Sequence, residues 1–426
     1  MDDVLKIGGV PVTELKERYG TPLYVYDEEK LLHQCRQYSQ YFSCDAFDTE
    51  VLYASKAFSC IEMLRLVKNQ GLSVDVVSMG ELFTALKAGI SPDRIYFHGN
   101  NKTLEEIQYA LDNHVQTFIV DNLQEAYLLA EEMKARDYVL HVLLRINPCI
   151  EAHTHEYIQT ANIDSKFGIH LESISQIVDL IQTLKQSDHI VFDGFHAHIG
   201  SQIFEKEAFV KEIETMFSLI DTMQKKGILC NTLNLGGGFA VHYTDEDQPI
   251  PISVFSSVIL ETCQKMQELY HTNIQKILIE PGRSIVAEAG STLYTVGFIK
   301  KTPHKKYVFV DGGMSDNIRP SLYQAKYEAD IVNHMDQKKN EMVCVAGKCC
   351  ESGDILIDSI ALPPCGSGDL LMVYSTGAYG FSMFNNYNRN LRPAVVFVKE
   401  GNSRLVVKRE TLQELVRGDV CDENPV

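Results

Sequence analysis

The stretch Val51-Leu-Tyr-Ala-Ser-Lys56-Ala57 is an apolar, strand-like run that ends near a lysine. Seven further runs rich in apolar and β-branched residues follow it, and they begin near Ser73, Arg94, Gln116, Tyr138, Ile190, Asn231 and Gln275. Most of the intervals between these runs have a helical pattern, and Thr103 and Asn122 are of the residue types that cap helices. This alternation predicts parallel β-strands that are connected by helices.

Eight such strands are the number that a (β/α)₈ barrel of the TIM type requires. Polar or glycine residues stand at or just past the C-terminal ends of these strands: Lys56, Ser78, 98–100, Asp121, 145–147, 198–201, 236–238 and Glu280. In a barrel these residues would meet at one mouth, whereas in an open doubly wound sheet they would spread along a crevice. We therefore expect an α/β barrel over residues 31–284.

Three of the strand ends carry the groups that bind pyridoxal phosphate. The amine of Lys56 can form an imine with the aldehyde of this cofactor. The backbone N–H groups of Gly236, Gly237 and Gly238 can bind its phosphate, because glycines let the chain approach an anion closely. The carboxylate of Glu280 can keep the ring nitrogen protonated, which makes the ring a better electron acceptor. The combination predicts a pyridoxal phosphate site.

Each of these residues also has an ordinary structural interpretation. A lysine that follows a strand is most often a surface residue, and a strand-to-helix turn often contains one or two glycines. Glu280 precedes Pro281-Gly282 and could be an acidic residue at a helix N-terminus. A histidine in a strand, such as His196 or His198, is usually structural. It is the combination at one expected mouth that favours the cofactor.

The chain changes character after about residue 284. Short strand-like runs, several of them separated by turns that contain glycine, occupy 292–300, 306–311, 342–346, 355–361, 369–374, 394–399 and 403–408. This pattern predicts a β-sandwich or β-barrel domain over 285–426. Residues 1–30 contain another extended run, Pro22-Leu-Tyr-Val-Tyr26, which we expect to join this β domain.

Composition excludes several classes of function. The net charge is −18 and no run of lysine and arginine stands out, so we expect no binding to nucleic acid or to an anionic membrane. No apolar stretch approaches the ~20 residues that span a bilayer, and the N-terminus does not resemble a signal peptide.

The eleven cysteines lack CxxC or CxxH spacing, which favours the cytoplasm over a disulfide framework or a zinc site. No carboxylate or cysteine stands at ligand spacing from His196 and His198, so we expect no metal.

The chain resembles the alanine-racemase-fold decarboxylases, the family that acts on diaminopimelate, ornithine or arginine, and it is most similar to the members that act on diaminopimelate. The resemblance covers nearly the whole chain, and its motifs occur in the family's order. They are Thr21-Pro-Leu-Tyr-Val-Tyr-Asp27, Tyr53-Ala-Ser-Lys56, Asp75-Val-Val-Ser-Met-Gly-Glu-Leu82, His98-Gly-Asn-Asn-Lys102, Ser165-Lys-Phe-Gly168, His196-Ala-His-Ile-Gly-Ser-Gln202, Leu235-Gly-Gly-Gly-Phe239, Glu280-Pro-Gly-Arg283, Ile318-Arg-Pro-Ser-Leu-Tyr323, Cys350-Glu-Ser-Gly-Asp354, Tyr379-Gly-Phe381 and Arg392-Pro393.

The resemblance implies a full set of site residues. Lys56 and Cys350 would be catalytic. The cofactor would be bound by Lys56, His198, Ser201, Gly236, Gly237, Gly238, Glu280, Pro281, Gly282, Arg283 and Tyr379, with His198 stacked on the ring. The substrate would be bound by Arg283, Arg319, Tyr323, Glu351 and Tyr379. Arg283 could serve the phosphate, the substrate or both.

The implied reaction is decarboxylation of meso-diaminopimelate to L-lysine and CO₂, the last step of lysine biosynthesis. Arg319 would bind the far carboxylate of the substrate and Glu351 its ammonium group. Cys350 or Lys56 would return a proton after CO₂ leaves, and the thiol of Cys350 can do so because it is mostly protonated at neutral pH. The family supplies this loop from a second subunit, which implies a homodimer with shared active sites. Here Lys348-Cys349 stands where the family has a proline and an apolar residue.

Other functions remain open at this point. A sister decarboxylase for ornithine, arginine or carboxynorspermidine would share the cofactor residues. A racemase would share the barrel but would not need Cys350 and Glu351. A non-catalytic binding or regulatory protein of the same fold would be expected to lose Lys56. Cys350 could also be an ordinary structural cysteine, and Arg319 could form a salt bridge at a domain junction.

Overall fold

The computed structural model describes residues 4–150 and 165–420, which form two compact units. The first unit comprises the described parts of Met1–Leu31, His242–Asp247 and Val286–Val426. The second comprises those of Leu32–Val241 and Gln248–Ile285. The short segment His242–Asp247 therefore belongs to the first unit although the residues on both sides of it belong to the second.

The second unit is a closed barrel, as the sequence predicts. Within the described residues, eight parallel strands pair in a ring in which β12 returns to β4 and β10 pairs directly with β8. The strands are β4 (Asp48–Ala54), β5 (Ser73–Val76), β6 (Ile95–Phe97), β7 (Thr117–Val120), β8 (Leu140–Asn147), β10 (Ile190–Ala197), β11 (Thr232–Asn234) and β12 (Lys276–Ile279). A two-residue strand, β9 (Ile169–His170), adds to the end of β8.

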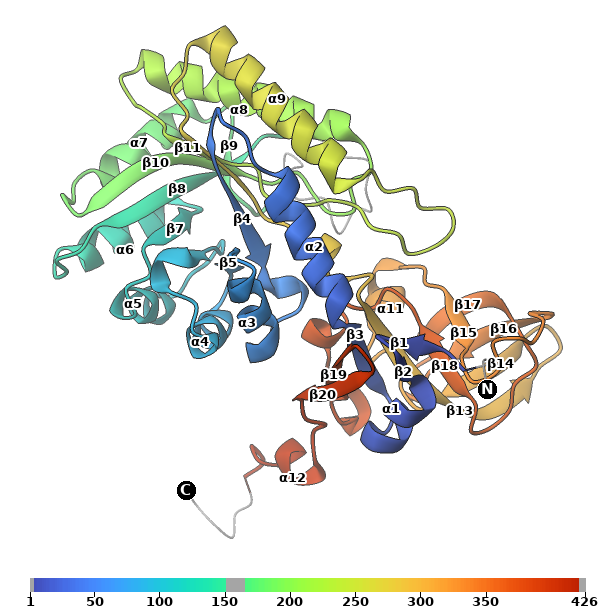
Figure 1. The fold of residues 1–426 in the computed structure, drawn as a ribbon. Coiled ribbons are helices and arrows are strands. Elements are labelled where there is room, and N and C mark those ends of the chain that lie inside the picture. The colour runs from blue at the N-terminus through green and yellow to red at the C-terminus, as the bar shows by residue number, and fades with distance from the viewer. Residues whose placement is uncertain (1–3, 151–164, 421–426) are drawn as a thin grey trace. The chain divides into compact units, whose positions relative to one another are not determined.

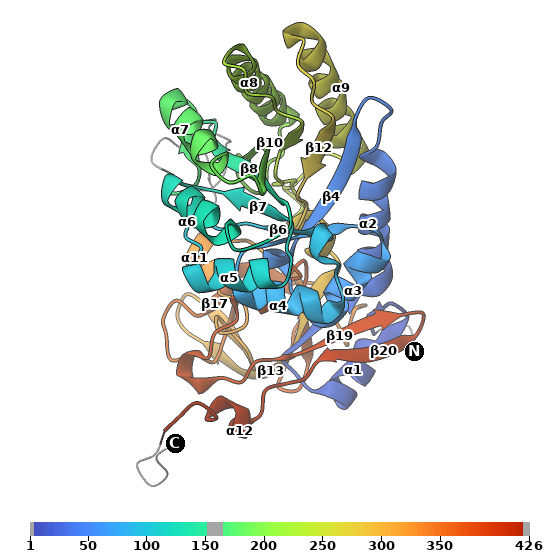
Figure 2. The ribbon, with the colours of Figure 1, turned by 90° about the vertical axis from the view of Figure 1, so that its left-hand side faces the viewer.

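Helices follow most of the strands and lie outside the ring (Figures 1 and 2). They are α2 (Glu28–Tyr41), α3 (Ile61–Asn69), α4 (Met79–Ala88), α5 (Leu104–Asp112), α6 (Leu123–Met133), α7 (Ile174–Leu184), α8 (Lys206–Lys225) and α9 (Ile252–Tyr270). The predicted caps are confirmed: Thr103 accepts from the N–H of Glu106 at 3.2 Å and Asn122 from that of Glu125 at 3.0 Å. Each cap satisfies a backbone donor that the first helical turn leaves unpaired.

The interior of the barrel is filled in layers, because alternate residues of a strand point to the same face. A buried apolar layer crosses the middle of the barrel and consists of Leu52, Tyr96, Ile119, Leu143 and Leu278. Below it, Glu50 accepts from the Tyr96 hydroxyl at 2.9 Å and pairs with Lys276. In β12 the period of two places Lys276 and Leu278 on this inner face, and it directs Glu280 to the mouth.

The first unit contains a mixed β-sheet. Its strands are β3 (Leu23–Asp27), β13 (Gly290–Lys301), β14 (Lys306–Val310), β15 (Ala329–Ile331), β16 (Glu341–Ala346), β17 (Ile355–Leu362), β18 (Leu370–Val373), β19 (Ala394–Lys399) and β20 (Asn402–Val407). β3 pairs antiparallel with β13 and parallel with β19. The short elements of this unit are β1 (Lys6–Ile7), β2 (Val10–Pro11), α1 (Val12–Tyr19), α11 (Arg319–Tyr323) and α12 (Leu412–Leu415). Val25, Leu293 and Val396 contribute to its buried core.

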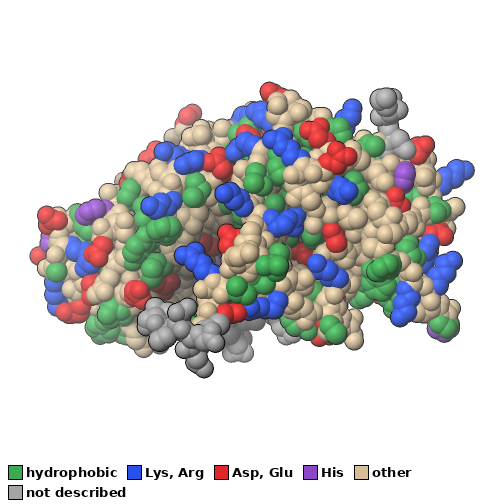
Figure 3. All heavy atoms as spheres, turned by 90° about the horizontal axis from the view of Figure 1, so that it is seen from below, with side chains coloured by type: hydrophobic (Ala, Val, Ile, Leu, Met, Phe, Trp, Pro, Cys, Tyr) green, Lys and Arg blue, Asp and Glu red, His purple; other side chains and the backbone are tan. Residues whose placement is uncertain are grey.

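Surface features agree with the composition. On the face drawn in Figure 3, lysine and arginine side chains are interspersed with acidic and apolar ones and do not merge into one basic area. All ten described cysteines are free. Among the helices of the described residues, none combines the length and the apolar character needed to cross a bilayer.

Candidate active site

A cavity of about 260 Å³ lies at the C-terminal ends of the barrel strands. Lys56 is exposed and follows β4 in the short 3₁₀ helix η1 (Ser55–Ala57), whereas Glu280 follows β12 and is buried. Both line the same cavity, so the barrel brings the predicted amine and carboxylate together. The remaining lining residues are Asp75, Val77, His98, Gly99, Asn100, Arg145, Phe167, His196 and His198.

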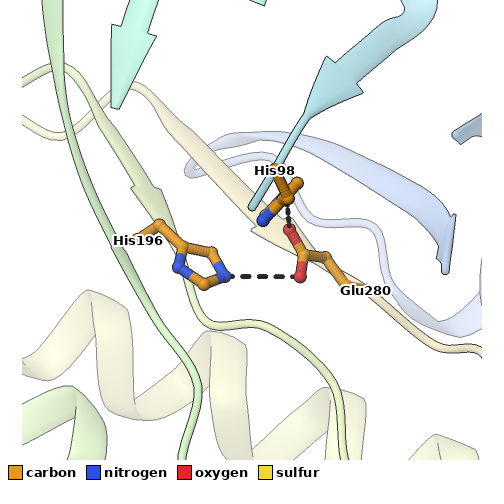
Figure 4. A group of neighbouring side chains, drawn as sticks. All are labelled: His98, His196 and Glu280. Atoms are coloured by element: carbon orange, nitrogen blue, oxygen red, sulfur yellow. Dashed lines mark hydrogen bonds and ion pairs between the residues drawn. The ribbon is translucent and has the colours of Figure 1, made fainter. Parts of the chain in front are cut away.

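The carboxylate of Glu280 has three partners, Asn234, His98 and His196, and Figure 4 shows the two histidines. Its Oε1 accepts a hydrogen bond of 2.7 Å from Asn234 Nδ2 and lies 2.9 Å from Nε2 of His98. Its Oε2 lies 3.3 Å from Nε2 of His196. Burial alone would raise the pKa of Glu280, but the two imidazoles hold this pKa well below its usual range. Glu280 is therefore a fixed, ionised carboxylate.

His196 in β10 and His198, which follows this strand, are neutral. Burial lowers the pKa of His196 to about 4, so this residue faces Glu280 as an uncharged N–H donor. Burial lowers the pKa of His198 well below its usual range, and the charges of Lys56 and Arg145 lower it further. Nδ1 of His198 accepts from the N–H of Gly237 at 3.3 Å, which requires an unprotonated nitrogen at that position.

The expectation of no carboxylate near these histidines is wrong in three dimensions. His98, His196 and Glu280 offer ligand atoms that all lie within 4.8 Å of one another, and all three residues are buried. Sequence spacing could not reveal this group, because Glu280 comes from a strand 84 residues beyond His196. The two imidazoles hold the charged carboxylate of Glu280 in place. A protonated ring nitrogen requires such a charged partner.

The three glycines are required by close approaches of the backbone. A Cβ atom at Gly237 would lie 2.1 Å from the carbonyl oxygen of Glu280, and one at Gly238 would lie 2.3 Å from that of Gly200. Gly236 and Gly238 have φ values of +61° and +110°, which favour glycine. The loop therefore has the cradle shape that an anion site needs.

Not all three amides are directed to an anion, however. The N–H of Gly236 donates to Asn234 Oδ1 at 2.9 Å, and that of Gly237 donates to His198. Gly238 has no such acceptor for its N–H among the described residues. In this structure the amides of Gly236 and Gly237 thus have acceptors within the protein, and phosphate binding by the three glycines stays a prediction.

Ser201 and Arg283 add polar groups beside this loop. Nε and an Nη atom of Arg283 donate to the hydroxyl of Ser201 at 3.1 and 2.8 Å. The hydroxyl accepts from the guanidinium, so its own hydrogen can point to an anion. The turn before Arg283 packs on the end of β4: Ala54 donates to the carbonyl of Pro281 at 3.1 Å, and a Cβ at Gly282 would lie 2.9 Å from Cβ of Ala54.

The remaining predicted residues belong to the first unit. Arg319 is buried beside the rings of Tyr243 and Tyr327, whose centroids lie 4.9 and 5.6 Å from its guanidinium carbon, and it donates to the Tyr327 hydroxyl. Its Nε has no hydrogen-bond partner among the described residues. Tyr323 ends α11 and is half-buried. Tyr379 is half-buried as well, and its φ of +60° is uncommon for a bulky side chain.

Cys350 and Glu351 stand on an exposed loop that follows β16. Buried Asp354 shapes the loop by accepting from the N–H of Met314 at 2.6 Å and from that of Cys349 at 2.7 Å. The N–H of Cys350 donates to Asn388 Oδ1 at 2.6 Å. The backbone of this loop is therefore fixed, while the side chains of Cys350 and Glu351 face solvent.

Comparison with known proteins identifies the family. A family model described as "Pyridoxal-dependent decarboxylase, pyridoxal binding domain" matches residues 28–287. The diaminopimelate decarboxylase of Bacillus subtilis is 49% identical over 418 residues, which are 98% of this chain and 95% of that protein. That of Halalkalibacterium halodurans is 46% identical, with coverages of 98% and 95%. A crystal structure of diaminopimelate decarboxylase from M. jannaschii in co-complex with L-lysine has a TM-score of 0.93 and 33% identity, and it covers 99% of this chain and 97% of that one.

The chain belongs to the diaminopimelate decarboxylase family.

Membership in the diaminopimelate decarboxylase family confirms the cofactor that the sequence predicts, because the matched model is that of a pyridoxal-binding domain. The residues at the barrel mouth fit this cofactor. Their chemistry matches its three functional groups: an amine for the aldehyde, a glycine loop with a nearby cation for the phosphate, and an ionised carboxylate for the ring nitrogen.

Sequence reasoning gave no role to several residues that line or support this family's site. Asp75 lies 3.8 Å from Nε2 of His98, and burial raises its pKa to about 6. Arg145 and Phe167 line the cavity, and Asn234 fixes Glu280. The strand period could have indicated Asp75, His98, Arg145 and Asn234, because they fall on the inward face at a strand end. Phe167 lies on no strand and had no such signal.

Proposed function

We propose that this chain catalyses the decarboxylation of meso-diaminopimelate to L-lysine and CO₂, the last step of lysine biosynthesis. The observation that carries the proposal is the ionised carboxylate of Glu280, fixed by Asn234, His98 and His196, in one cavity with Lys56. The names of relatives that are 46–49% identical over almost the entire chain support the choice of substrate.

Pyridoxal phosphate, when bound, accepts the electron pair that the substrate carbon retains as CO₂ departs. Lys56 would attach the coenzyme through its amine and would release it to the substrate amine. Glu280 would keep the ring nitrogen protonated, and neutral His198 would pack against the ring. Ser201, Arg283 and the 236–238 loop would hold the phosphate, together with the turn at Pro281 and Gly282. The hydrogen bond that Arg283 donates to Ser201 supports a role for Arg283 in binding the phosphate of the coenzyme.

The family resemblance assigns Arg319, Tyr323, Glu351 and Tyr379 to the substrate. Arg319 recognises the far carboxylate through its guanidinium and Glu351 binds the far ammonium group. Tyr323 and Tyr379 complete this part of the site. The orphaned Nε of buried Arg319 supports this role, because a buried guanidinium donor without an acceptor is costly unless a ligand supplies one. Cys350 returns the proton to the substrate carbon.

The protein acts as a homodimer with shared sites, in which Cys350 and Glu351 serve the barrel of the partner subunit. Exposure of both side chains on a loop with a fixed backbone supports this arrangement. The free cysteines support the cytoplasm, a reducing compartment, as the location of the enzyme.

The test is a CO₂-release assay that compares meso-diaminopimelate with ornithine, arginine and carboxynorspermidine. Ornithine lacks the far carboxylate, so kcat/KM should be lower for it by roughly 100-fold or more. Arg319→Ala should raise KM for diaminopimelate at least ~10-fold and leave coenzyme binding intact. Arg389→Ala, which removes an exposed arginine paired with Asp419, is the matched control. Equal turnover of ornithine and diaminopimelate would refute the assignment.

A further inference from the structure

Lys102 closes the motif His98-Gly-Asn-Asn-Lys102, and the proposed function gives it no role. Its side chain is only 1% exposed. Its ammonium donates to the carbonyls of Gly99 at 2.9 Å and Ile119 at 2.7 Å, and to Glu125 Oε1 at 2.6 Å. These three bonds use all the hydrogens of the ammonium group. Burying a charge requires such pairing, so Lys102 firmly joins the loop after β6 to β7 and α6.

The contacts continue from Glu125 to Asp121. Oε2 of Glu125 accepts from the backbone N–H of Asp121 at 3.0 Å. The Asp121 carboxylate in turn accepts from the N–H of Gly168 through both oxygens, at 3.0 and 3.1 Å. Asp121 and Glu125 are both buried. A continuous set of hydrogen bonds therefore leads from Lys102 to the backbone at Gly168.

The surroundings of Gly168 leave little room for a side chain. Its φ is +73°, and a Cβ atom there would lie 3.0 Å from the backbone nitrogen of Asn147 and 3.1 Å from Cγ of Arg145. The preceding residue, Phe167, has its ring centroid 4.5 Å from the guanidinium carbon of Arg145. Phe167 and Arg145 both line the cavity. The place of Gly168 thus sets how Phe167 stacks on Arg145.

We propose that Asp121 is a positioning residue of the coenzyme site: by holding the N–H of Gly168, it keeps Phe167 stacked on Arg145 as one wall of the cavity. The inference rests on the proposed function in taking this cavity as the coenzyme site. Asp121 itself does not line the cavity and acts through its neighbours. If Asp121 had a purely structural role, it would stabilise the barrel without any specific effect on the contact between Phe167 and Arg145.

The experiment compares Asp121→Ala with Asp121→Asn in the full-length holoenzyme. Asparagine retains an oxygen that can accept from Gly168, whereas alanine does not. Glu131→Ala, which removes an exposed acidic side chain of α6, the helix that follows Asp121, is the control. Hydrogen exchange at the peptide that contains Gly168, and the rate of coenzyme release followed by absorbance, are measured. Asp121→Ala should raise both by roughly 10-fold or more, because a hydrogen bond to a carboxylate is lost.

Asp121→Asn should return both quantities to within about 3-fold of the unmodified protein, and Glu131→Ala should change neither. If alanine prevents folding, Asp121→Leu, which has a similar size and no acceptor, replaces it. The proposal is overturned if exchange at Gly168 does not change, or if asparagine is as defective as alanine. An inactive unmodified enzyme would count against the proposed function alone, since neither readout measures turnover.

Discussion

Nε2 of His98 lies 2.9 Å from Oε1 of Glu280, and this contact joins two strand ends that are remote in the sequence (Figure 4). A buried carboxylate without partners would bind a proton, because burial disfavours the charged form. Here the imidazoles of His98 and His196 hold the pKa of Glu280 well below its usual range. The site therefore offers a permanent negative charge at neutral pH, and this charge is the feature that the first prediction tests.

Glu280→Gln should lower kcat by on the order of 100-fold, because glutamine has the shape of the carboxylate but cannot stabilise a protonated ring nitrogen. The midpoint of urea unfolding should change little, since Asn234 retains an oxygen partner. Steady-state kinetics and unfolding curves check both expectations. Glu261→Gln on the exposed side of α9 is the control. A fully active Glu280→Gln enzyme would show that catalysis does not depend on the negative charge of Glu280.

Lys56→Ala should abolish covalent attachment of the coenzyme, because no other amine would take its place. Reduction of the holoenzyme with borohydride followed by intact mass measurement should show the added coenzyme mass in the unmodified protein and in Lys68→Ala. The latter removes an exposed lysine of α3. Finding the added mass in Lys56→Ala would show that the coenzyme is attached to another lysine.

Hybrid dimers test whether sites are shared. Dissociation and remixing of Lys56→Ala with Cys350→Ala should restore about a quarter of the original activity, because half the dimers are hybrids and each hybrid has one complete site. Lys56→Ala mixed with Glu280→Gln should stay inactive, since these two residues line one cavity of one chain. Activity that does not recover in the first mixture would place Cys350 in its own subunit's site, and full activity of Cys350→Ala alone would place it outside catalysis.

Glu212 should make stability fall with rising pH. This residue of α8 is fully buried, and its carboxyl oxygens have no hydrogen-bond partner among the described residues. Burial raises the pKa of Glu212 well above its usual 4.5, and the charge of Glu280 raises it further. The folded protein thus keeps a proton that the unfolded chain releases. This contribution is present below about pH 4.5 and declines by about 1.4 kcal/mol per pH unit above it, until the pH passes the folded-state pKa.

Glu212→Gln should remove this slope, and Glu212→Met should also raise the free energy of unfolding by about 1–3 kcal/mol over the glutamine variant. Glutamine retains an unpaired polar group and methionine does not. Urea unfolding at a series of pH values between about 5 and 8 measures both effects. Identical pH slopes for the unmodified protein and Glu212→Gln would show that the carboxyl is ionised when folded.

Much of the fold follows from local patterns. Strands that are buried on both faces are continuous apolar runs, and all eight barrel strands start within a few residues of the positions that such runs predict. The caps at Thr103 and Asn122 are equally local. Other features have no local signal. β15 (Ala329–Ile331) is too short for a period to be recognised, and nothing in His242–Asp247 indicates that it belongs to the first unit.

The sequence by itself determined which side chains stand at strand ends, Lys56 and Glu280 among them, because a period of two is a property of the chain alone. Only the tertiary structure decided that Lys56 and Glu280 share one cavity and how Glu280 is held. Closure of the barrel brings Asn234, His98 and His196 to Glu280. The physical reason is that hydrogen-bond partners across a barrel depend on strand register and closure, which no short segment of sequence contains.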